Sequence, residues 1–92
     1  MNKEQLIKAV SAETNISQKE VATILNAFTE TIVETVADGD KVVLIGFGSF
    51  EPRHRKERQG MNPKTKEPLT IAATTVPAFS PGKLFKEKVK PQ

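Results

Sequence analysis

The chain has 92 residues, the size of one small domain, and it contains no cysteine, which excludes disulfides and thiolate metal sites. Its start, MNKEQLIKAV, lacks the apolar run of a signal peptide, and no stretch is long and apolar enough to span a bilayer, so we expect a cytoplasmic protein without membrane partners. Residues 1–40 carry three lysines against seven carboxylates, a charge of −4, whereas residues 41–92 carry eleven basic residues against four acidic ones, a charge of +7. This division indicates a polyanionic partner for the second part, with a merely solvated basic surface as the alternative.

Two helices are predicted first. Asn2 followed by Gln5 is typical of a helix start, and this first helix is expected to end near Asn15. Ser17 with Glu20 forms the pattern of a capping box, and Gly39 suits the end of the helix that follows. Between them, apolar residues recur at spacings of three and four over 21–36, which predicts one helix to about residue 37. Its wide apolar stripe fits a dimer core or a broad intramolecular face.

Strands follow the helices. KVVLI (41–45) is short, apolar and β-branched, Gly46-Phe47-Gly48 predicts a turn, and a second strand begins near Ser49. LTIAATTVPAF (69–79) is predicted to be the strand that returns along it. Ser80-Pro81 has the pattern of a helix cap and first turn, which predicts a last helix to about Lys90. Its apolar residues Leu84, Phe85 and Val89 are expected to face inward.

The segment RHRKERQGMNPKTKEP (53–68) contains six basic and two acidic residues, and Met61 is its only large aliphatic side chain. A strand that is polar on both faces has no core to cover, so we expect it to project into solvent as half of a β-ribbon with its tip near Asn62-Pro63. From Arg53 to Pro63 an extended strand spans on the order of 33 Å. An isolated ribbon of this kind is only marginally stable in water, which predicts a mobile outer part.

Catalysis is poorly supported by these residues. His54 is the only histidine and lies among cations, so neither a zinc site nor a histidine-based triad can be assembled. Gly46-Phe47-Gly48 joins two predicted strands and lacks the third glycine of a dinucleotide site, although its backbone amides could hold a phosphate. We therefore predict no catalytic residue, cofactor, metal or small-molecule substrate, and no enzymatic activity.

Nucleic acid explains the ribbon better. Arginines on projecting strands can contact phosphates on both sides of a groove, and their planar forks can enter a narrow minor groove. Pro63 near the tip is placed like the rigid wedges that unstack base steps and kink DNA, although a proline in a loop is usually only a turn residue.

Three runs carry a resemblance to a known family: G-F-G-S-F (46–50), R-K-E-R-Q-G-M-N-P-K-T (55–65) and V-P-A-F-S-P-G-K-L-F-K (76–86). With the N-K-x-x-L-I start and the Asp38-Gly39-Asp40 turn, the chain resembles the HU and integration-host-factor family of bacterial DNA-bending proteins over its full length. The resemblance implies an α+β fold and an intertwined homodimer, with a helical base (two N-terminal helices and a short C-terminal helix) and a three-stranded antiparallel sheet that extends into a long β-ribbon arm. One domain over 1–92 is implied, with a dimerisation part at 1–40, a sheet at 41–80 whose arm covers about 53–75, and the last helix at 81–92.

The resemblance also implies roles for particular residues. Arg53, Arg55 and Arg58 are expected to contact phosphates and the groove, and Pro63, flanked by Asn62 and Lys64, is expected to intercalate. The backbone of Gly46, Phe47 and Gly48 is expected to clamp a phosphate, and flanking DNA contacts are expected from Lys3, Lys83 and Lys86. The dimer core is expected to contain Phe47, Phe50 and Phe79. Two positions depart from the family pattern: Met61 stands where the family usually has arginine, and Lys66 stands where it often has glycine.

The predicted function is a histone-like architectural protein of the nucleoid that binds duplex DNA through the minor groove with little sequence specificity, and bends and compacts it. A site-specific bender of the integration-host-factor type is the alternative. Binding of single strands or RNA is disfavoured, because all five phenylalanines fall outside residues 53–68 and stacking needs aromatic side chains on the basic surface. A polyanion-dependent enzyme or a purely structural oligomer is the alternative from another class.

Overall fold

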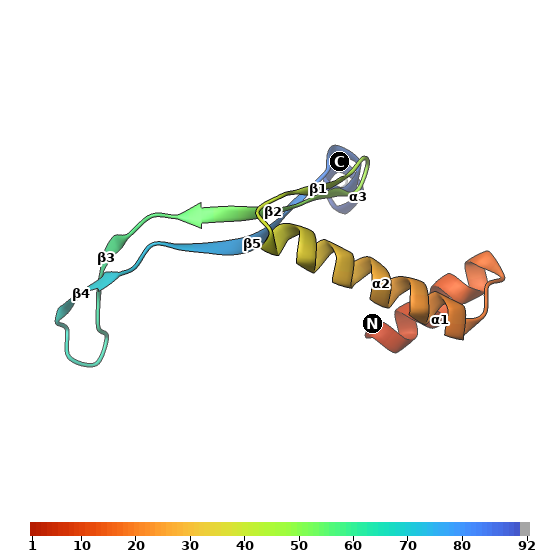
Figure 1. Cartoon of the computed structure of the whole chain (residues 1–92), viewed down its shortest axis with the longest axis horizontal. Coiled ribbons are helices and arrows are strands. Elements are labelled where there is room, and N and C mark those ends of the chain that lie inside the picture. The colour runs from red at the N-terminus through yellow and green to blue at the C-terminus, as the bar shows by residue number, and fades with distance from the viewer. Residues whose placement is uncertain (91–92) are drawn as a thin grey trace. The chain divides into compact units, whose positions relative to one another are not determined.

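The computed structural model describes residues 1–90, which form two compact units, one of residues 1–34 and one that begins at Thr35. Helices and antiparallel strands both occur, so the predicted α+β class is confirmed (Figure 1). No helix within the described residues is long and apolar enough to cross a membrane. In chain order the elements are α1 (Lys3–Thr14), α2 (Gln18–Ala37), β1 (Val42–Leu44), β2 (Gly48–Arg55), β3 (Arg58–Met61), β4 (Pro68–Ile71), β5 (Thr74–Pro81) and α3 (Lys83–Val89).

The two helix starts are set by local side-chain bonds, as predicted. The Asn2 side chain accepts a hydrogen bond from the Gln5 amide at 2.9 Å, and the Gln5 side chain accepts one from the Asn2 amide at 3.0 Å. At α2 the Ser17 hydroxyl accepts from the Glu20 amide at 3.1 Å. These bonds satisfy amides that have no partner inside the helix, so each helix begins where its cap stands.

The end of α2 is fixed by backbone geometry. Gly39 has a φ of 91°, its amide donates to the Val36 carbonyl at 3.0 Å, and the Asp40 amide donates to the Thr35 carbonyl at 3.1 Å. This pair of bonds is the Schellman motif, which requires a left-handed residue and therefore favours glycine. The predicted helix stop at Gly39 is confirmed.

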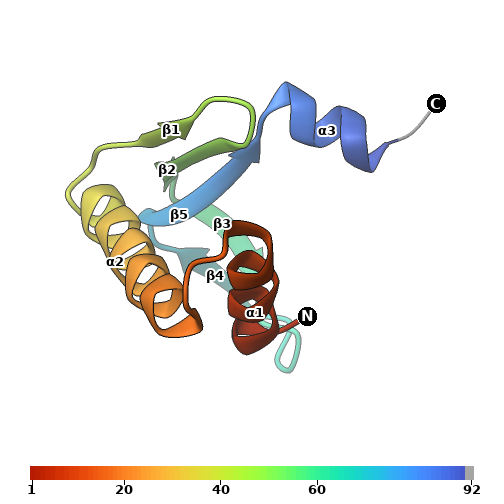
Figure 2. The same cartoon turned by 90° about the vertical axis from the view of Figure 1, so that its right-hand side faces the viewer.

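β2 lies between β1 and β5 in a three-stranded antiparallel sheet (Figure 2). Phe50 is paired with Val42 on one side and with Phe79 on the other. The three-stranded sheet predicted from the sequence is confirmed.

Beyond this sheet the chain continues as a second pair of strands, β3 and β4, which are connected by the tip loop 62–67. We use the term arm for residues 53–75. The register passes unchanged from Arg55↔Thr74 to Arg58↔Ile71, and two residues on each strand, 56–57 and 72–73, lie outside the strands. The predicted ribbon is therefore confirmed, but it consists of two paired segments and not one.

The predicted start of the last helix is wrong. Ser80 and Pro81 belong to β5, where they pair with Ser49 and Gly48, and α3 begins at Lys83 after Gly82 as its N-cap. The Ser80 hydroxyl donates a hydrogen bond to Glu51 and accepts one from Arg53, so it does not cap a helix. The last two positions of the predicted helix, 91–92, lie outside the described residues.

The single chain buries almost none of its apolar side chains. Among residues 1–90, Val21 is the only hydrophobic residue that is buried, at 6% exposure. Leu84, Phe85 and Val89, which were predicted to face inward, are exposed in the chain. Exposed large hydrophobic residues occur in both units, including Leu6, Ile24, Phe28, Val33, Val43, Ile45, Phe47, Phe79 and Phe85. Since burial of apolar surface is the main driving force of folding, the monomer lacks a sufficient core.

Candidate nucleic-acid interface

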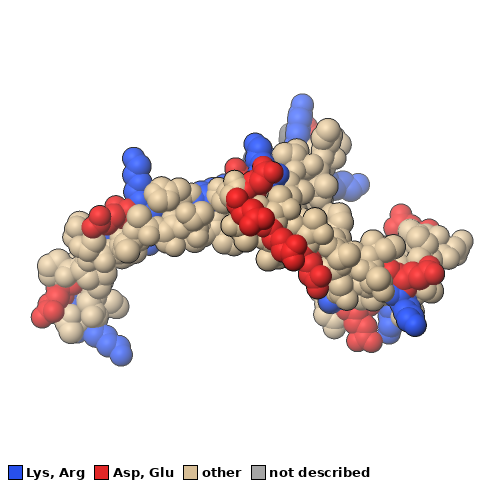
Figure 3. All heavy atoms as spheres, in the orientation of Figure 1, with Lys and Arg blue, Asp and Glu red and all other residues tan. Residues whose placement is uncertain are grey.

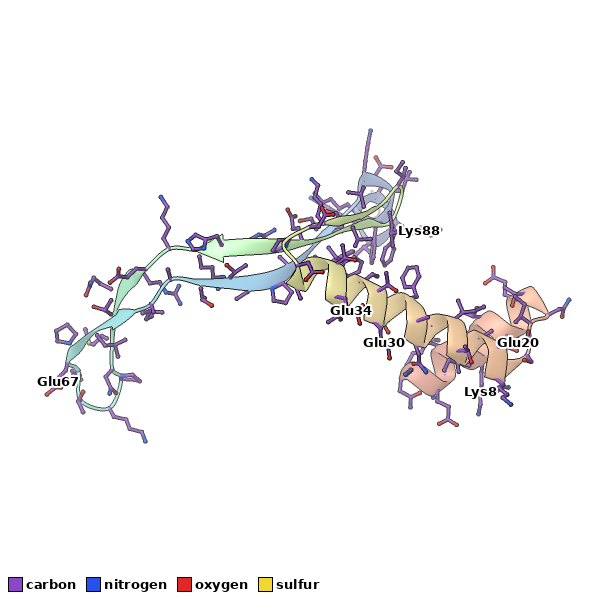
Figure 4. All side chains as sticks on the ribbon, viewed as in Figure 1. Lys8, Glu20, Glu30, Glu34, Glu67 and Lys88 are labelled. Carbon is purple, nitrogen blue, oxygen red and sulfur yellow. The ribbon has the colours of Figure 1, made fainter. Side chains whose placement is uncertain are left out.

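The predicted arginines of the arm are all exposed to solvent. Arg53 and Arg55 alternate along β2 and therefore share one face of the ribbon, opposite Val76 and Thr74 of β5. Arg58 is the first residue of β3 and is paired with Ile71. Figure 3 shows basic side chains spaced along the arm, in contrast to the row of acidic side chains on α2, where Glu30 and Glu34 lie one helical turn apart (Figure 4).

Arg53 has protein partners at the base of the arm. Its Nη2 donates to the Ser80 hydroxyl oxygen at 3.3 Å and lies 3.7 Å from Glu51 Oε1. The same Ser80 hydroxyl donates to Glu51 Oε1 at 3.0 Å. No such carboxylate partner occurs for Arg55 or Arg58 in the described part of the chain. The sequence analysis did not predict this cluster, because its members are up to 29 residues apart.

The tip loop holds Pro63 in an exposed position. Asn62 closes the loop on both sides: its amide donates to the Glu67 carbonyl at 2.9 Å, and its carbonyl accepts from the Lys66 amide at 2.7 Å. The Asn62 side chain also accepts from the Lys64 amide at 2.9 Å, across Pro63. Lys66 has a φ of 59°, the left-handed conformation that glycine adopts without strain. The side chain of Glu67 lies at this tip (Figure 4).

A small apolar patch on the return strand was missed by the sequence analysis. Leu69 and Ile71 alternate along β4 and lie on the face of Gly60, where an added Cβ would come within 3.1 Å of Ile71 Cδ1. Met61 lies on the opposite face, paired with Pro68, and is 64% exposed. The pattern L-x-I in LTIA could have indicated this patch, but only pairing with Gly60 brings the two side chains together.

The turn at 46–48 is bound to the start of α3. The Phe47 amide donates to the Leu44 carbonyl at 2.9 Å, so it is used inside the turn, and the Phe47 carbonyl accepts from the Gly82 amide at 2.8 Å. The chain passes so closely at Gly48 that an added Cβ would lie 2.6 Å from the Ser80 carbonyl oxygen and 2.7 Å from the Phe79 ring. Of the predicted phosphate-binding amides, that of Phe47 is therefore already engaged.

The predicted flanking lysines lie on different units. Lys83 and Lys86 are exposed on α3, and Lys83 Nζ is 4.0 Å from Glu87 Oε1, one helical turn further on. Lys3 belongs to the first unit, where its Nζ donates a short hydrogen bond to Asn26 Oδ1.

The predicted aromatic residues form one cluster. Ring centroids are 4.9 Å apart between Phe50 and Phe79 and 5.4 Å apart between Phe47 and Phe79. Phe85 of α3 extends the cluster at 5.5 Å from Phe47. Phe47, Phe79 and Phe85 remain partly exposed, so the cluster has an apolar face that the single chain does not cover.

No group of three or more potential metal-binding side chains occurs among residues 1–90. His54 is exposed on β2 and is paired with Thr75. The geometry is that of a basic binding surface.

Comparisons with known proteins agree with this surface. A family model described as bacterial DNA-binding protein matches residues 1–90. The DNA-binding protein HU of a Nostoc strain is 56% identical over 91 residues, which cover 99% of this chain and 97% of that protein. The HU of Thermotoga maritima is 48% identical over 90 residues, which cover 98% of this chain and all of the relative. An Anabaena HU–DNA cocrystal structure matches with a TM-score of 0.92 and 55% identity, with 100% of both chains covered. The resemblance seen in the sequence is thus confirmed, and the chain belongs to the HU and integration-host-factor family of bacterial DNA-binding proteins.

Proposed function

We propose that the protein is an architectural component of the nucleoid, in the cytoplasm, which binds duplex DNA as a homodimer with little sequence preference and bends it. The observation that carries this proposal is the exposed cationic arm whose tip loop holds Pro63 outward. The relatives named HU and the HU structure crystallised with DNA support it. We expect no enzymatic activity, because the family is one of DNA-binding proteins.

The contacts are directed mainly to the DNA backbone. Arg53, Arg55 and Arg58 place guanidinium groups along the arm, and such groups bind phosphates and fit a narrow minor groove. Binding of this kind releases counterions and depends strongly on salt. If about six phosphates are neutralised, log K falls with log salt at a slope of about −5.

Pro63 is the intercalating wedge in this proposal. A wedge must be rigid and exposed, and the three hydrogen bonds made by Asn62 hold the backbone on both sides of Pro63. Lys64 and Asn62 then contact the DNA next to the unstacked step. Because Met61 stands where the family usually has arginine, each arm has one cationic groove contact fewer, and the Met61 thioether contacts the sugars instead. Lys66 adds a positive charge at the tip.

The homodimer follows from the lack of a core in the single chain. Exposed apolar residues on α2 and the open face of the phenylalanine cluster supply the surface that a second copy covers. In this assembly residues 1–40 form the dimerisation part, and Phe47, Phe50 and Phe79 belong to the shared core. The whole chain is then one domain, with its arm at about 53–75.

Flanking DNA is bound outside the arm. Lys83 and Lys86 of α3 lie beside the turn at 46–48, to which α3 is tied by the Gly82–Phe47 hydrogen bond. In the turn, the amide of Gly46 remains a candidate for a phosphate clamp, whereas Phe47 supports the turn and Gly48 is paired with Leu44 and Pro81 as the first residue of β2. Lys3 contributes from the start of α1.

A titration of labelled duplexes tests the proposal. Fluorescence anisotropy is measured at about 50 and about 200 mM salt with an intact duplex, a nicked duplex and several unrelated sequences. We expect similar affinities for the unrelated sequences, tighter binding of the nicked duplex, and a steep loss of affinity with salt. Absence of salt-dependent binding would refute the proposal, and a large preference for one sequence would favour a bender of the integration-host-factor type.

A further inference from the structure

Among the arginines of the arm, Arg53 is the one that has a carboxylate within ion-pair distance. Its guanidinium lies 3.7 Å from Glu51 Oε1, and both groups contact the Ser80 hydroxyl. The side chain of Arg53 is about half exposed, at 52%, whereas the side chain of Glu51 is more covered, at 31%. A ligand that approaches from solvent therefore has access to Arg53 but meets Glu51 beside it.

The strand register builds this cluster. Glu51 and Arg53 are two residues apart on β2, so their side chains emerge on the same face. On β5, Ser80 is paired with Ser49 of β2, which places Ser80 diagonally beside Glu51 on that face. A hydroxyl has one proton to donate and lone pairs to accept with. Because Ser80 gives its proton to Glu51, its lone pair is left to accept the hydrogen bond from Arg53.

The cluster changes what Arg53 offers to a phosphate. An isolated guanidinium adds one positive charge to the surface, but Arg53 and Glu51 together add none. A phosphate next to Arg53 is repelled by the Glu51 carboxylate at close range, since like charges a few ångströms apart oppose each other even where water screens them. Arg55 and Arg58, which have no such partner in the described part of the chain, keep their full attraction.

We propose that Glu51, held by Ser80, is an internal competitor for Arg53, so that the base of the arm contacts DNA only when a phosphate replaces the carboxylate. Glu51 thereby acts as a positioning residue that limits the affinity of the arm base and leaves the outer arm unaffected. This inference rests on the proposed DNA-binding function. It assigns to an acidic residue on the binding face a role in setting affinity.

The test is a double-mutant cycle between Glu51 and Arg53, read out by DNA affinity and by its salt slope. Glu51→Gln keeps the shape of the side chain and removes its charge. Exposed ion pairs are weak, so we expect affinity to rise about threefold for each arm and about tenfold for a dimer. The salt slope should steepen by about one to two, because each freed Arg53 displaces a further counterion.

Glu57→Gln is the matched control, because Glu57 is an exposed carboxylate of the arm without an ion-pair partner in residues 1–90. It changes the net charge equally, so any general charge effect appears in both variants. In the Arg53→Ala background, the gain from Glu51→Gln should fall to the level of Glu57→Gln. If Glu51→Gln does not fold, Glu51→Thr also removes the carboxylate and suits a strand, with the same expected gain.

The outcomes are separable. If the unchanged protein does not bind DNA, the proposed function fails. If it binds, but Glu51→Gln leaves affinity and salt slope unchanged, weakens binding, or matches Glu57→Gln in both backgrounds, the competitor role is refuted. A gain that depends on Arg53 supports it.

Discussion

Pro52 on β2 lies directly opposite Pro77 on β5. Residues opposite each other in an antiparallel pair either exchange both backbone hydrogen bonds or exchange none. Because proline has no amide hydrogen, Pro52 and Pro77 form a pair that exchanges no hydrogen bonds. The nitrogen of each proline therefore points away from the partner strand, toward the outer edge of the ribbon. If the pairing of β1 with β2 continued beyond Val42↔Phe50, Asp40 would lie opposite Pro52, but Pro52 has no amide hydrogen to donate to it. The pairing of β1 therefore ends at Val42, and both edges of the ribbon are poor templates for another strand.

Restoring a donor at Pro77 should promote association through this edge. β5 is the outer strand of its sheet, so Pro77→Thr presents a free amide to solvent. We expect the free energy of unfolding to change by less than about 1 kcal/mol, while light scattering on prolonged incubation increases. Thr75→Val, which alters the same strand without adding a donor, is the control and should not aggregate. Equal scattering from both variants would show that the proline does not protect the edge.

Gly48 should not tolerate even one additional carbon atom. In Gly48→Ala the new Cβ meets a backbone oxygen at 2.6 Å and the Phe79 ring at 2.7 Å, and neither can move aside without disturbing the sheet. We expect a loss of about 2–3 kcal/mol in the free energy of unfolding, measured by denaturant titration at fixed protein concentration.

Gly39→Ala is a useful comparison for that measurement. Nothing lies within 4 Å of a Cβ there, so only the left-handed backbone, with φ of 91°, is penalised. The expected cost is about 1–2 kcal/mol. A smaller effect at Gly48 than at Gly39 would contradict the close approach.

Pro63→Ala should separate bending from affinity. The wedge acts on base stacking, whereas most of the binding free energy comes from phosphate contacts. Energy transfer between dyes at the two ends of a duplex should therefore fall markedly, with a change in dissociation constant of less than about tenfold. Pro68→Ala, at the first position of β4, serves as the control and should retain bending. The same bend with and without Pro63 would exclude the wedge role.

Lys66→Gly should tighten the tip loop. Lys66 has a φ of 59°, which costs a residue with a side chain about 1 kcal/mol more than glycine. Hydrogen exchange at the amides of Asn62 and Lys66, which close the loop, should slow in the variant. Lys64→Gly removes the same charge without relieving a left-handed residue, and it should not slow exchange. Faster exchange in Lys66→Gly would show that the lysine conformation is not strained.

The features that could be predicted from the sequence are those that depend on neighbours in the chain. Asn2 with Gln5, the Ser17 cap and Gly39 each act within a few residues, so their patterns indicate the helix ends correctly. The arm was predicted because a strand without apolar side chains has only one plausible environment, which is solvent.

Features set by distant partners could not be predicted in the same way. Ser80-Pro81 has the local pattern of a helix cap, but pairing with Ser49 and Gly48 keeps it in β5. The same pairing brings Ser80 to Glu51 and Arg53, so Arg53 was predicted as a DNA contact but its two protein partners were missed. Which amides of the turn at 46–48 are free also depends on the position of the Leu44 carbonyl and not on the glycines alone.

The two interruptions of the arm, at 56–57 and 72–73, divide it mechanically. No ladder hydrogen bonds cross this joint, although the pairing frame is the same on both sides. The outer segment can therefore open and re-form while the inner segment stays paired, and the inner pairs, which end at Arg55↔Thr74, keep the register in which it re-forms. An arm built in this way can adapt to ligands of different curvature by losing only the strand pairing of its outer half.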